Sequence, residues 1–88
     1  MKLSAKVAEH ADELAAIEQR DCGKPTKQAK ADALALVRYF EFYAGAGDKL
    51  HGDTIPYLDG YSVLTWREPH GVTGHVIPWT YPMQIFGR

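Results

Sequence analysis

Residues 71–82 read Gly-Val-Thr-Gly-His-Val-Ile-Pro-Trp-Thr-Tyr-Pro, and the rest of the chain is best interpreted outward from them. The mostly apolar segment 72–77 predicts a short buried strand. The two prolines of 78–82 restrict the residues before them to extended backbone, so we expect a rigid turn there. Pro82 also suits the first position of a helix, whose start is expected over 83–88. The order strand, turn, helix is typical of an α/β fold.

The predicted turn carries three side chains that could serve a ligand: the indole of Trp79, the hydroxyl of Thr80 and the phenol of Tyr81. In α/β folds, ligands bind beyond the carboxyl ends of strands, where this turn would lie. An indole, a hydroxyl and a phenol could line such a site. Alternatively, the turn only packs, with Trp79 as an aromatic anchor. The residues alone leave both interpretations open.

A β-hairpin is predicted upstream of this stretch, over 53–68. Residues 53–58 form a short strand candidate, and the next two residues, Asp59 and Gly60, form a dipeptide typical of tight hairpin turns. The chain from 61 to 68 then alternates between two faces, as a second strand does.

Two helices are predicted before the hairpin, over 4–22 and 26–45. In each, apolar side chains recur three and four residues apart, which places them on one stripe of a helix. Ser4 is expected to cap the first helix, and Thr26 or Asp32 could cap the second.

The composition excludes several classes of function. The chain has 88 residues, of which 45% are hydrophobic, so it forms at most one small domain. A net charge of −1 offers no basic excess for nucleic acid or for an anionic membrane. No continuous run of apolar residues approaches the ~20 that span a bilayer. The single cysteine suits a reducing compartment, and the start lacks the apolar segment of a signal peptide, so a cytoplasmic location is expected.

The chain is expected to be a piece of a longer protein. Met83, Ile85 and Phe86 are the apolar positions of a helix that has barely begun where the sequence stops. A chain this small without a disulfide or a metal also depends on tight packing or on a partner.

Other candidate sites are weaker. Cys22 lies near a helix C-terminus, where the helix dipole disfavours a thiolate, so an ordinary half-buried thiol is expected. No two histidines have the helical spacing of metal ligands, and no metal site is expected; the four are His10, His51, His70 and His75.

Five segments of the chain resemble motifs of the aldehyde dehydrogenase superfamily, in order and spacing, from about Glu13 to Pro82. Residues Glu13–Pro25 resemble "LA-x-LE … D-x-GKP", and Tyr39–Lys49 resemble "YYAG-x-ADK". Gly52–Pro56 resemble "G-x-TIP", Arg67–Val72 resemble "REPVGV" and Val76–Pro82 resemble "IIPWNYP". Each motif is weak alone, but together they are specific.

The resemblance implies an enzyme that oxidises an aldehyde to a carboxylic acid with NAD or NADP. Family members are several-fold longer and use a cysteine nucleophile and a glutamate base that lie downstream of the Pro-Trp turn. This chain is therefore expected to contain neither group and to be inactive alone; Cys22 is not that nucleophile. The alternative is a stand-alone, non-catalytic interaction module that assembles with a full-length enzyme.

The resemblance also implies roles for single residues. Ile77, Pro78 and Trp79 match the turn that lies against the cofactor. Thr80 matches an asparagine whose side-chain amide helps to hold the oxyanion, and Tyr81 matches an aromatic residue that lines the aldehyde tunnel.

The resemblance also implies where two further segments lie in the family fold. The hairpin 53–68 matches strands of the oligomerisation sheet, which implies a homo-oligomer. The segment 72–77 matches the first strand of the nucleotide-binding domain.

Thr80 departs from the family pattern. A hydroxyl is shorter than an amide and also accepts hydrogen bonds. Losing an oxyanion donor lowers turnover by roughly 10²–10³-fold, so an enzyme with Thr80 is expected to be slow. His70 stands where the motif has valine, a lesser departure with an expected local effect.

Overall fold

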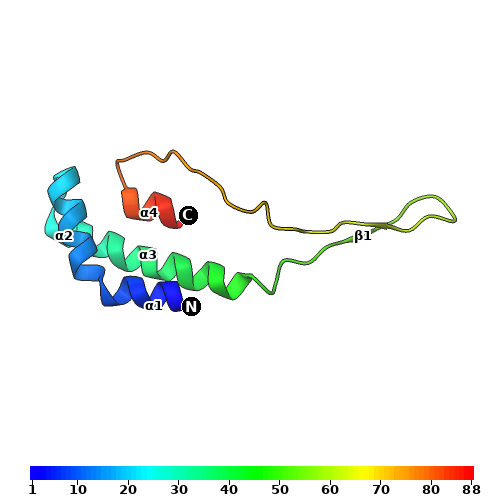
Figure 1. The fold of residues 1–88 in the computed structure, drawn as a ribbon, viewed down its shortest axis with the longest axis horizontal. Coiled ribbons are helices and arrows are strands. Elements are labelled where there is room, and N and C mark those ends of the chain that lie inside the picture. Colours follow the sequence, from blue (N-terminus) through cyan, green and yellow to red (C-terminus); the bar gives the residue numbers. More distant parts are fainter.

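The structure, a computed structural model, describes all residues 1–88 and consists of a helical body and a long arm (Figure 1). Its elements are, in order, α1 Lys2–Glu9, α2 Ala11–Cys22, α3 Thr26–Ala46, β1 Thr54–Ile55, β2 Val63–Leu64 and α4 Pro82–Gly87. The molecule measures 62 × 24 × 20 Å because the arm extends away from the helices and then returns. The chain is therefore mostly helical, with one small antiparallel sheet, and the predicted α/β class holds only in part.

Helix α3 is the centre of the body, because α1, α2 and α4 all pack against it. The buried core is small and draws on all four helices; it comprises Val7, Ala15, Ala29, Ala33, Leu36 and Met83. Ala29 and Ala33 are fully buried on α3, where their small side chains let the neighbouring helices approach closely. The predicted helix over 26–45 ends one residue later in the structure.

The single helix predicted over 4–22 is two helices in the structure. The chain breaks at His10, whose φ of −104° and ψ of 15° lie outside the helical region. The break lets both halves lie against α3, whereas one straight helix would carry one end away from it. Apolar spacing does not reveal such a break, because the stripe continues in register on both sides of it.

The expected caps are also corrected. Ser4 lies inside α1, where it is buried, and its hydroxyl donates a hydrogen bond of 3.0 Å to the backbone carbonyl of Val37 in α3. Asp32 does not cap α3 either, since it lies within the helix and is fully buried.

The predicted hairpin over 53–68 forms a shorter sheet than expected. β1 and β2 pair antiparallel in the register Thr54 to Leu64 and Ile55 to Val63. The backbone N–H of Tyr61 donates to the carbonyl of Leu58 at 3.1 Å and closes the tip, where Gly60 takes a φ of +85°. No second layer covers the sheet, so most of its side chains are exposed.

The strand predicted over 72–77 does not form. The segment is extended, but a strand needs a hydrogen-bonded neighbour and residues 1–88 supply none beside it. Val72 and Val76 are consequently fully exposed, contrary to the expected burial.

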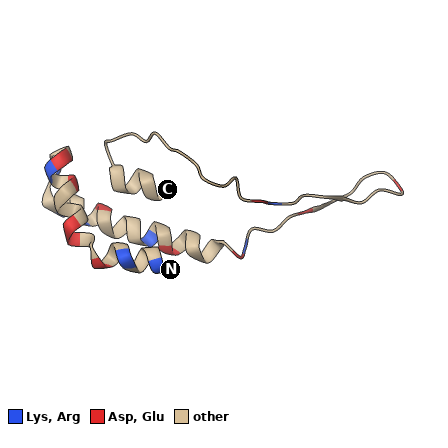
Figure 2. Ribbon diagram, in the orientation of Figure 1, with Lys and Arg blue, Asp and Glu red and all other residues tan.

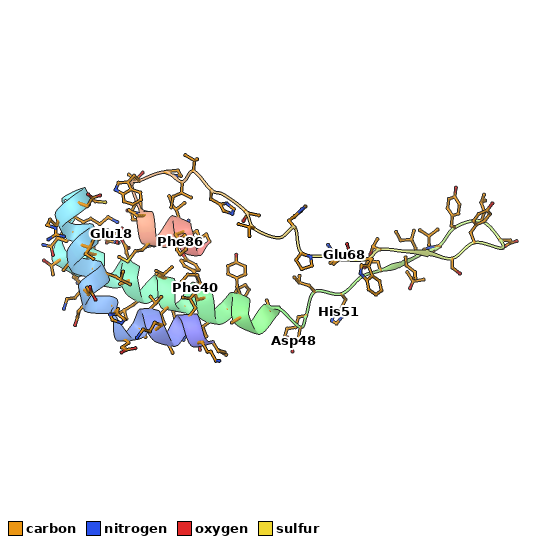
Figure 3. All side chains as sticks on the ribbon, in the orientation of Figure 1. Glu18, Phe40, Asp48, His51, Glu68 and Phe86 are labelled. Carbon is orange, nitrogen blue, oxygen red and sulfur yellow. The ribbon has the colours of Figure 1, made fainter.

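Helix α4 returns the chain to the body. As predicted, Pro82 opens the helix at its first turn. The rings of Phe40 in α3 and Phe86 in α4 point toward one another, edge to face, with centroids 5.8 Å apart (Figure 3). Gly87 is buried against α3, where an added Cβ would lie 2.8 Å from Cδ2 of Tyr39 and 3.0 Å from Cδ1 of Leu36.

We expect Gly87→Ala to lower the free energy of unfolding by about 1–2 kcal/mol, because the added methyl overpacks the contact between α3 and α4. Gly45→Ala is the matched control: it lies in α3 with no atom near an added Cβ, and should raise stability by up to ~1 kcal/mol. Chemical unfolding followed by circular dichroism measures both. Equal effects of the two substitutions would show that α4 is not docked on α3.

Candidate functional site

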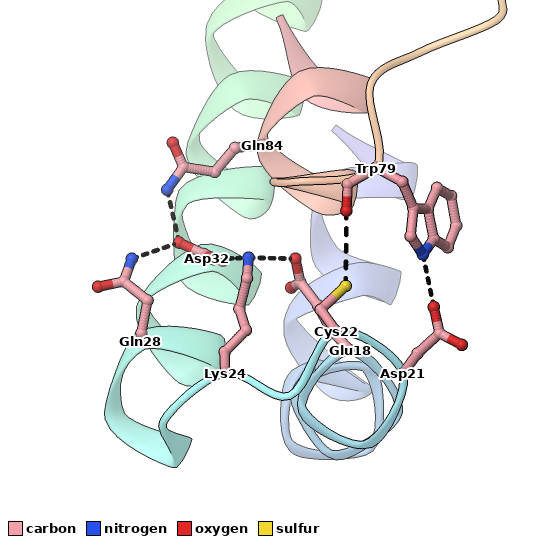
Figure 4. A network of polar contacts seen from close by, with 8 residues as sticks. All are labelled: Glu18, Asp21, Cys22, Lys24, Gln28, Asp32, Trp79 and Gln84. Atoms are coloured by element: carbon pink, nitrogen blue, oxygen red, sulfur yellow. Dashed lines mark hydrogen bonds and ion pairs between the residues drawn. The ribbon is translucent and has the colours of Figure 1, made fainter.

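The Pro-Trp turn lies beside the end of α2 and the connection to α3, which make three contacts with it. Figure 4 shows the two contacts to Trp79. The indole N–H of Trp79 donates a short hydrogen bond to the carboxylate of Asp21. The thiol of Cys22 donates to the backbone carbonyl of Trp79 at 3.6 Å. The Nζ atom of Lys24 lies 4.4 Å from the centroid of the Tyr81 ring, within the range of a cation–π interaction.

A buried ionic network stands behind these contacts (Figure 4). Nζ of Lys24 lies 2.7 Å from Oε1 of Glu18 and 2.6 Å from Oδ2 of Asp32. The other oxygen of Asp32 accepts hydrogen bonds from Nε2 of Gln28, at 2.8 Å, and of Gln84, at 2.6 Å. Asp32 is fully buried and Glu18 nearly so. The network thus joins α2, α3 and α4 through charged hydrogen bonds.

The charges of this network are set by competing effects. Burial alone would raise the pKa of Asp32, but hydrogen bonds from Lys24, Gln84 and Gln28 outweigh it and hold the pKa below its ordinary value. Burial alone would lower the pKa of Lys24, but hydrogen bonds to Asp32 and Glu18 raise it above its ordinary value. Both groups are therefore charged at neutral pH. One ammonium serves two buried carboxylates, and Oε2 of Glu18 has no hydrogen-bond partner.

Cys22 is a poor nucleophile in this position. Burial, together with the nearby carboxylates of Asp21 and Glu18, raises the pKa of its thiol, and Lys24 offsets this only in part. The protonated thiol instead serves as a hydrogen-bond donor to the turn. This agrees with the expectation of an ordinary thiol.

The other predicted site residues lie together on the turn but differ in their surroundings. Thr80 is exposed, and its hydroxyl makes no hydrogen bond within residues 1–88. Ile77 and Trp79 line an apolar hollow of ≈ 440 Å³ over the helical body, with side chains of all four helices. Pro78 is exposed at the bend, and Tyr81 packs one ring face toward Lys24.

Sequence reasoning missed the ionic network. A usable signal was present: Asp32 follows Ala29 by three residues and Glu18 follows Ala15 by three, which places both carboxylates on the apolar stripes of their helices. A buried carboxylate needs a cation, and Lys24 is positioned between the two helices.

His, Cys, Asp and Glu side chains form no group of three or more that could hold a metal ion. None of the four helices combines the length and apolar character needed to cross a bilayer.

We expect Lys24→Met to lower the free energy of unfolding by about 3 kcal/mol or more at pH 7, because it leaves two buried carboxylates without a cation. Lys30→Met is the matched control, since Lys30 pairs with Asp12 at the surface and should contribute less than about 1 kcal/mol. Urea unfolding measures both. Similar losses from the two substitutions would mean that the network is not buried.

The stability difference between wild type and Lys24→Met should depend on pH. The lowered pKa of Asp32 means that its contribution is complete above its ordinary pKa of 3.8 and is lost as the pH falls through the lowered value. The raised pKa of Lys24 means that its contribution is complete below 10.5 and is lost as the pH rises through the raised value. The difference in the free energy of unfolding should therefore be largest between pH 3.8 and pH 10.5, and should narrow in stronger acid and in stronger base. A difference that stays constant down to pH 2 would contradict this assignment.

Comparisons with known proteins find a matching family, similar sequences and a similar structure. The sequence model of the Aldehyde dehydrogenase family matches residues 1–88. A mitochondrial benzaldehyde dehydrogenase of Antirrhinum majus is 44% identical over 99% of this chain, and a hydroxyisobutyraldehyde dehydrogenase of Mycolicibacterium austroafricanum is 42% identical over 99%. The crystal structure of a proposed aldehyde dehydrogenase from Burkholderia cenocepacia superposes with a TM-score of 0.89 and 74% identity over 98% of this chain.

The chain spans 16% and 17% of the length of these two relatives and 18% of the Burkholderia chain. The matched part is the N-terminal region, and it includes the helices and the small antiparallel sheet. Since the family match extends over every residue of the chain, the protein belongs to the aldehyde dehydrogenase family and corresponds to an N-terminal portion of its members.

Proposed function

We propose that residues 1–88 form the N-terminal part of an enzyme that oxidises an aldehyde to a carboxylic acid with NAD or NADP. The observation that carries this proposal is the Pro-Trp turn of a family member, held on the helical body by Asp21, Cys22 and Lys24 while the hydroxyl of Thr80 stays exposed and unpaired. A free hydroxyl on an anchored turn suits the stabilisation of charge that develops on a substrate oxygen.

The fit of a dinucleotide to this part of the chain is partial. No residue from Pro69 to Gly87 is charged, and this segment is uniformly tan in Figure 2. Ile77, Pro78 and Trp79 therefore suit packing against the uncharged rings and riboses of a dinucleotide, but they offer no cation for its phosphates. The bound cofactor would supply the hydride acceptor. In this proposal the three residues form one wall of its site.

Thr80 and Tyr81 would contribute to the substrate side. The Thr80 hydroxyl would donate a hydrogen bond to the aldehyde oxygen as it gains negative charge, and Tyr81, partly exposed beside it, would line the approach of the aldehyde. Because a hydroxyl can also rotate and accept hydrogen bonds, Thr80 should hold the oxyanion less well than an amide. The protonated thiol of Cys22 does not suit the nucleophile, which we place beyond residue 88. The 88-residue chain alone should thus be inactive.

The arm would serve assembly in this proposal. Leu58, Leu64 and Trp66 are largely exposed on the hairpin over 53–68, and both edges of its two-stranded sheet are free. Exposed apolar strands with free edges suit pairing with another subunit, so we infer a homo-oligomer of the longer enzyme.

A second candidate is a non-catalytic interaction module that assembles with a full-length enzyme. The observation in its favour is that the helical body has its own buried core and ionic network. A cooperative thermal melt of the 88-residue chain, together with an inactive chimera in the experiment below, would favour this second candidate.

The test of the oxidation proposal is a chimera in which residues 1–88 replace the matching segment of the Burkholderia protein. We expect it to oxidise aldehydes slowly, and Thr80→Asn to raise kcat by roughly 10²–10³-fold with little change in KM for the cofactor. NADH or NADPH formation at 340 nm measures both.

Thr73→Asn is the control, because the Thr73 hydroxyl bonds to His75 outside the turn. An unchanged kcat in Thr80→Asn would refute the oxyanion role of this position. A chimera that reduces neither cofactor with any aldehyde would refute the proposed function.

A further inference from the structure

We propose that the end of α2 and its connection to α3, residues 21–24, position the Pro-Trp turn, with Lys24 as the central positioning residue. This inference rests on the proposed function and gives a role in it to Lys24, which lies outside the predicted site. Figure 4 shows the end of α2 facing the turn, with Asp21 and Cys22 joined to Trp79. The third contact is made by Lys24, which lies against the ring of Tyr81.

The three contacts fix three different groups of the turn. Asp21 holds the Trp79 side chain through its indole N–H, and Cys22 holds the Trp79 main chain through its carbonyl. Lys24 holds the ring of Tyr81 by a cation–π interaction. Thr80 lies between the two residues that are held. Its backbone is therefore restrained on both sides, while its hydroxyl remains free to bind.

Lys24 can position Tyr81 because its own ammonium is fixed. Two carboxylates hold it, at 2.7 Å and 2.6 Å, and its side chain is only 9% exposed. Asp32 also accepts a hydrogen bond from Gln84 in α4, the helix that follows the turn. The buried carboxylate of Asp32 therefore helps to hold both Lys24, which contacts Tyr81, and α4.

Asp21 allows the positioning of Trp79 to be tested apart from the stability of the helical body. Asp21 is exposed in the last turn of α2, where a negative charge is unfavourable with the helix dipole. Removing this carboxylate should therefore leave the helical body as stable or slightly more stable. A change in the state of Trp79 would then report a positioning role that a stability measurement does not detect.

The first experiment uses the 88-residue chain labelled with ¹⁵N at tryptophan, which gives two indole N–H resonances. Trp66 is 82% exposed and serves as the internal reference. Asp21→Ala should move the Trp79 resonance upfield and accelerate its exchange with solvent several-fold, without lowering the melting temperature. Asp48→Ala is the control, because Asp48 follows the end of α3 and pairs only with Lys49. If Asp21→Ala leaves both indole resonances in place, the proposal is wrong.

The second experiment uses the chimera described above with Lys24→Met and Asp21→Ala. Displacing a reacting group by about 1 Å can lower the rate by 10²-fold, so we expect kcat to fall at least tenfold in Lys24→Met with a smaller change in KM for the aldehyde. An unchanged kcat in both variants of an active chimera would overturn the positioning role. If the parent chimera is inactive, the proposed function fails, and the indole resonances alone decide whether residues 21–24 position the turn.

Discussion

The ammonium of Lys24 between the carboxylates of Glu18 and Asp32 is the interaction on which the helical body depends. The apolar core is too small to fix one arrangement, since half of its six buried residues are alanines. Alanine stripes allow helices to slide past one another at little cost. Sliding of α2 along α3 would separate the buried charges of Glu18, Lys24 and Asp32, and sliding of α4 would break the hydrogen bond from Gln84 to Asp32. Because an unpaired buried charge is strongly unfavourable, the ionic network selects the register in which the helices meet.

The ionic network also helps to explain how the turn is held in place while the hydroxyl of Thr80 stays unpaired. A loop that carries function must be held without using the groups that act. Here residues 21–24, at the end of α2 and in its connection to α3, contact the indole, one carbonyl and one ring face, and none of these contacts uses the hydroxyl of Thr80. Figure 2 shows charged residues on the helices and on the arm but none on the turn, so the ionic network lies behind an uncharged turn.

The sequence patterns predicted the elements that depend on local physics and missed those that depend on neighbours. The α3 helix and the opening of α4 at Pro82 follow from apolar spacing and from the geometry of proline. The break at His10 does not, because it is imposed by packing on α3 and leaves the apolar stripe intact. Within the candidate site, the sequence singles out Trp79, Thr80 and Tyr81, and their roles stay predictions. The burial of Asp32, a possible helix cap by sequence, depends on how separate helices pack and does not follow from local pattern.

The segment 72–77 shows how one sequence pattern can be sound and yet produce no strand. It is mostly apolar and carries two valines and an isoleucine, which suits a short buried strand, and its backbone is extended in Figure 1. Strand formation also needs a partner backbone, and Val72 and Val76 instead face solvent. The relatives are about six times as long as this chain, since it covers 16–18% of their length. The local preference of 72–77 for a strand is therefore unmet within residues 1–88, whereas the helical body, through Lys24 and α3, supplies its own packing.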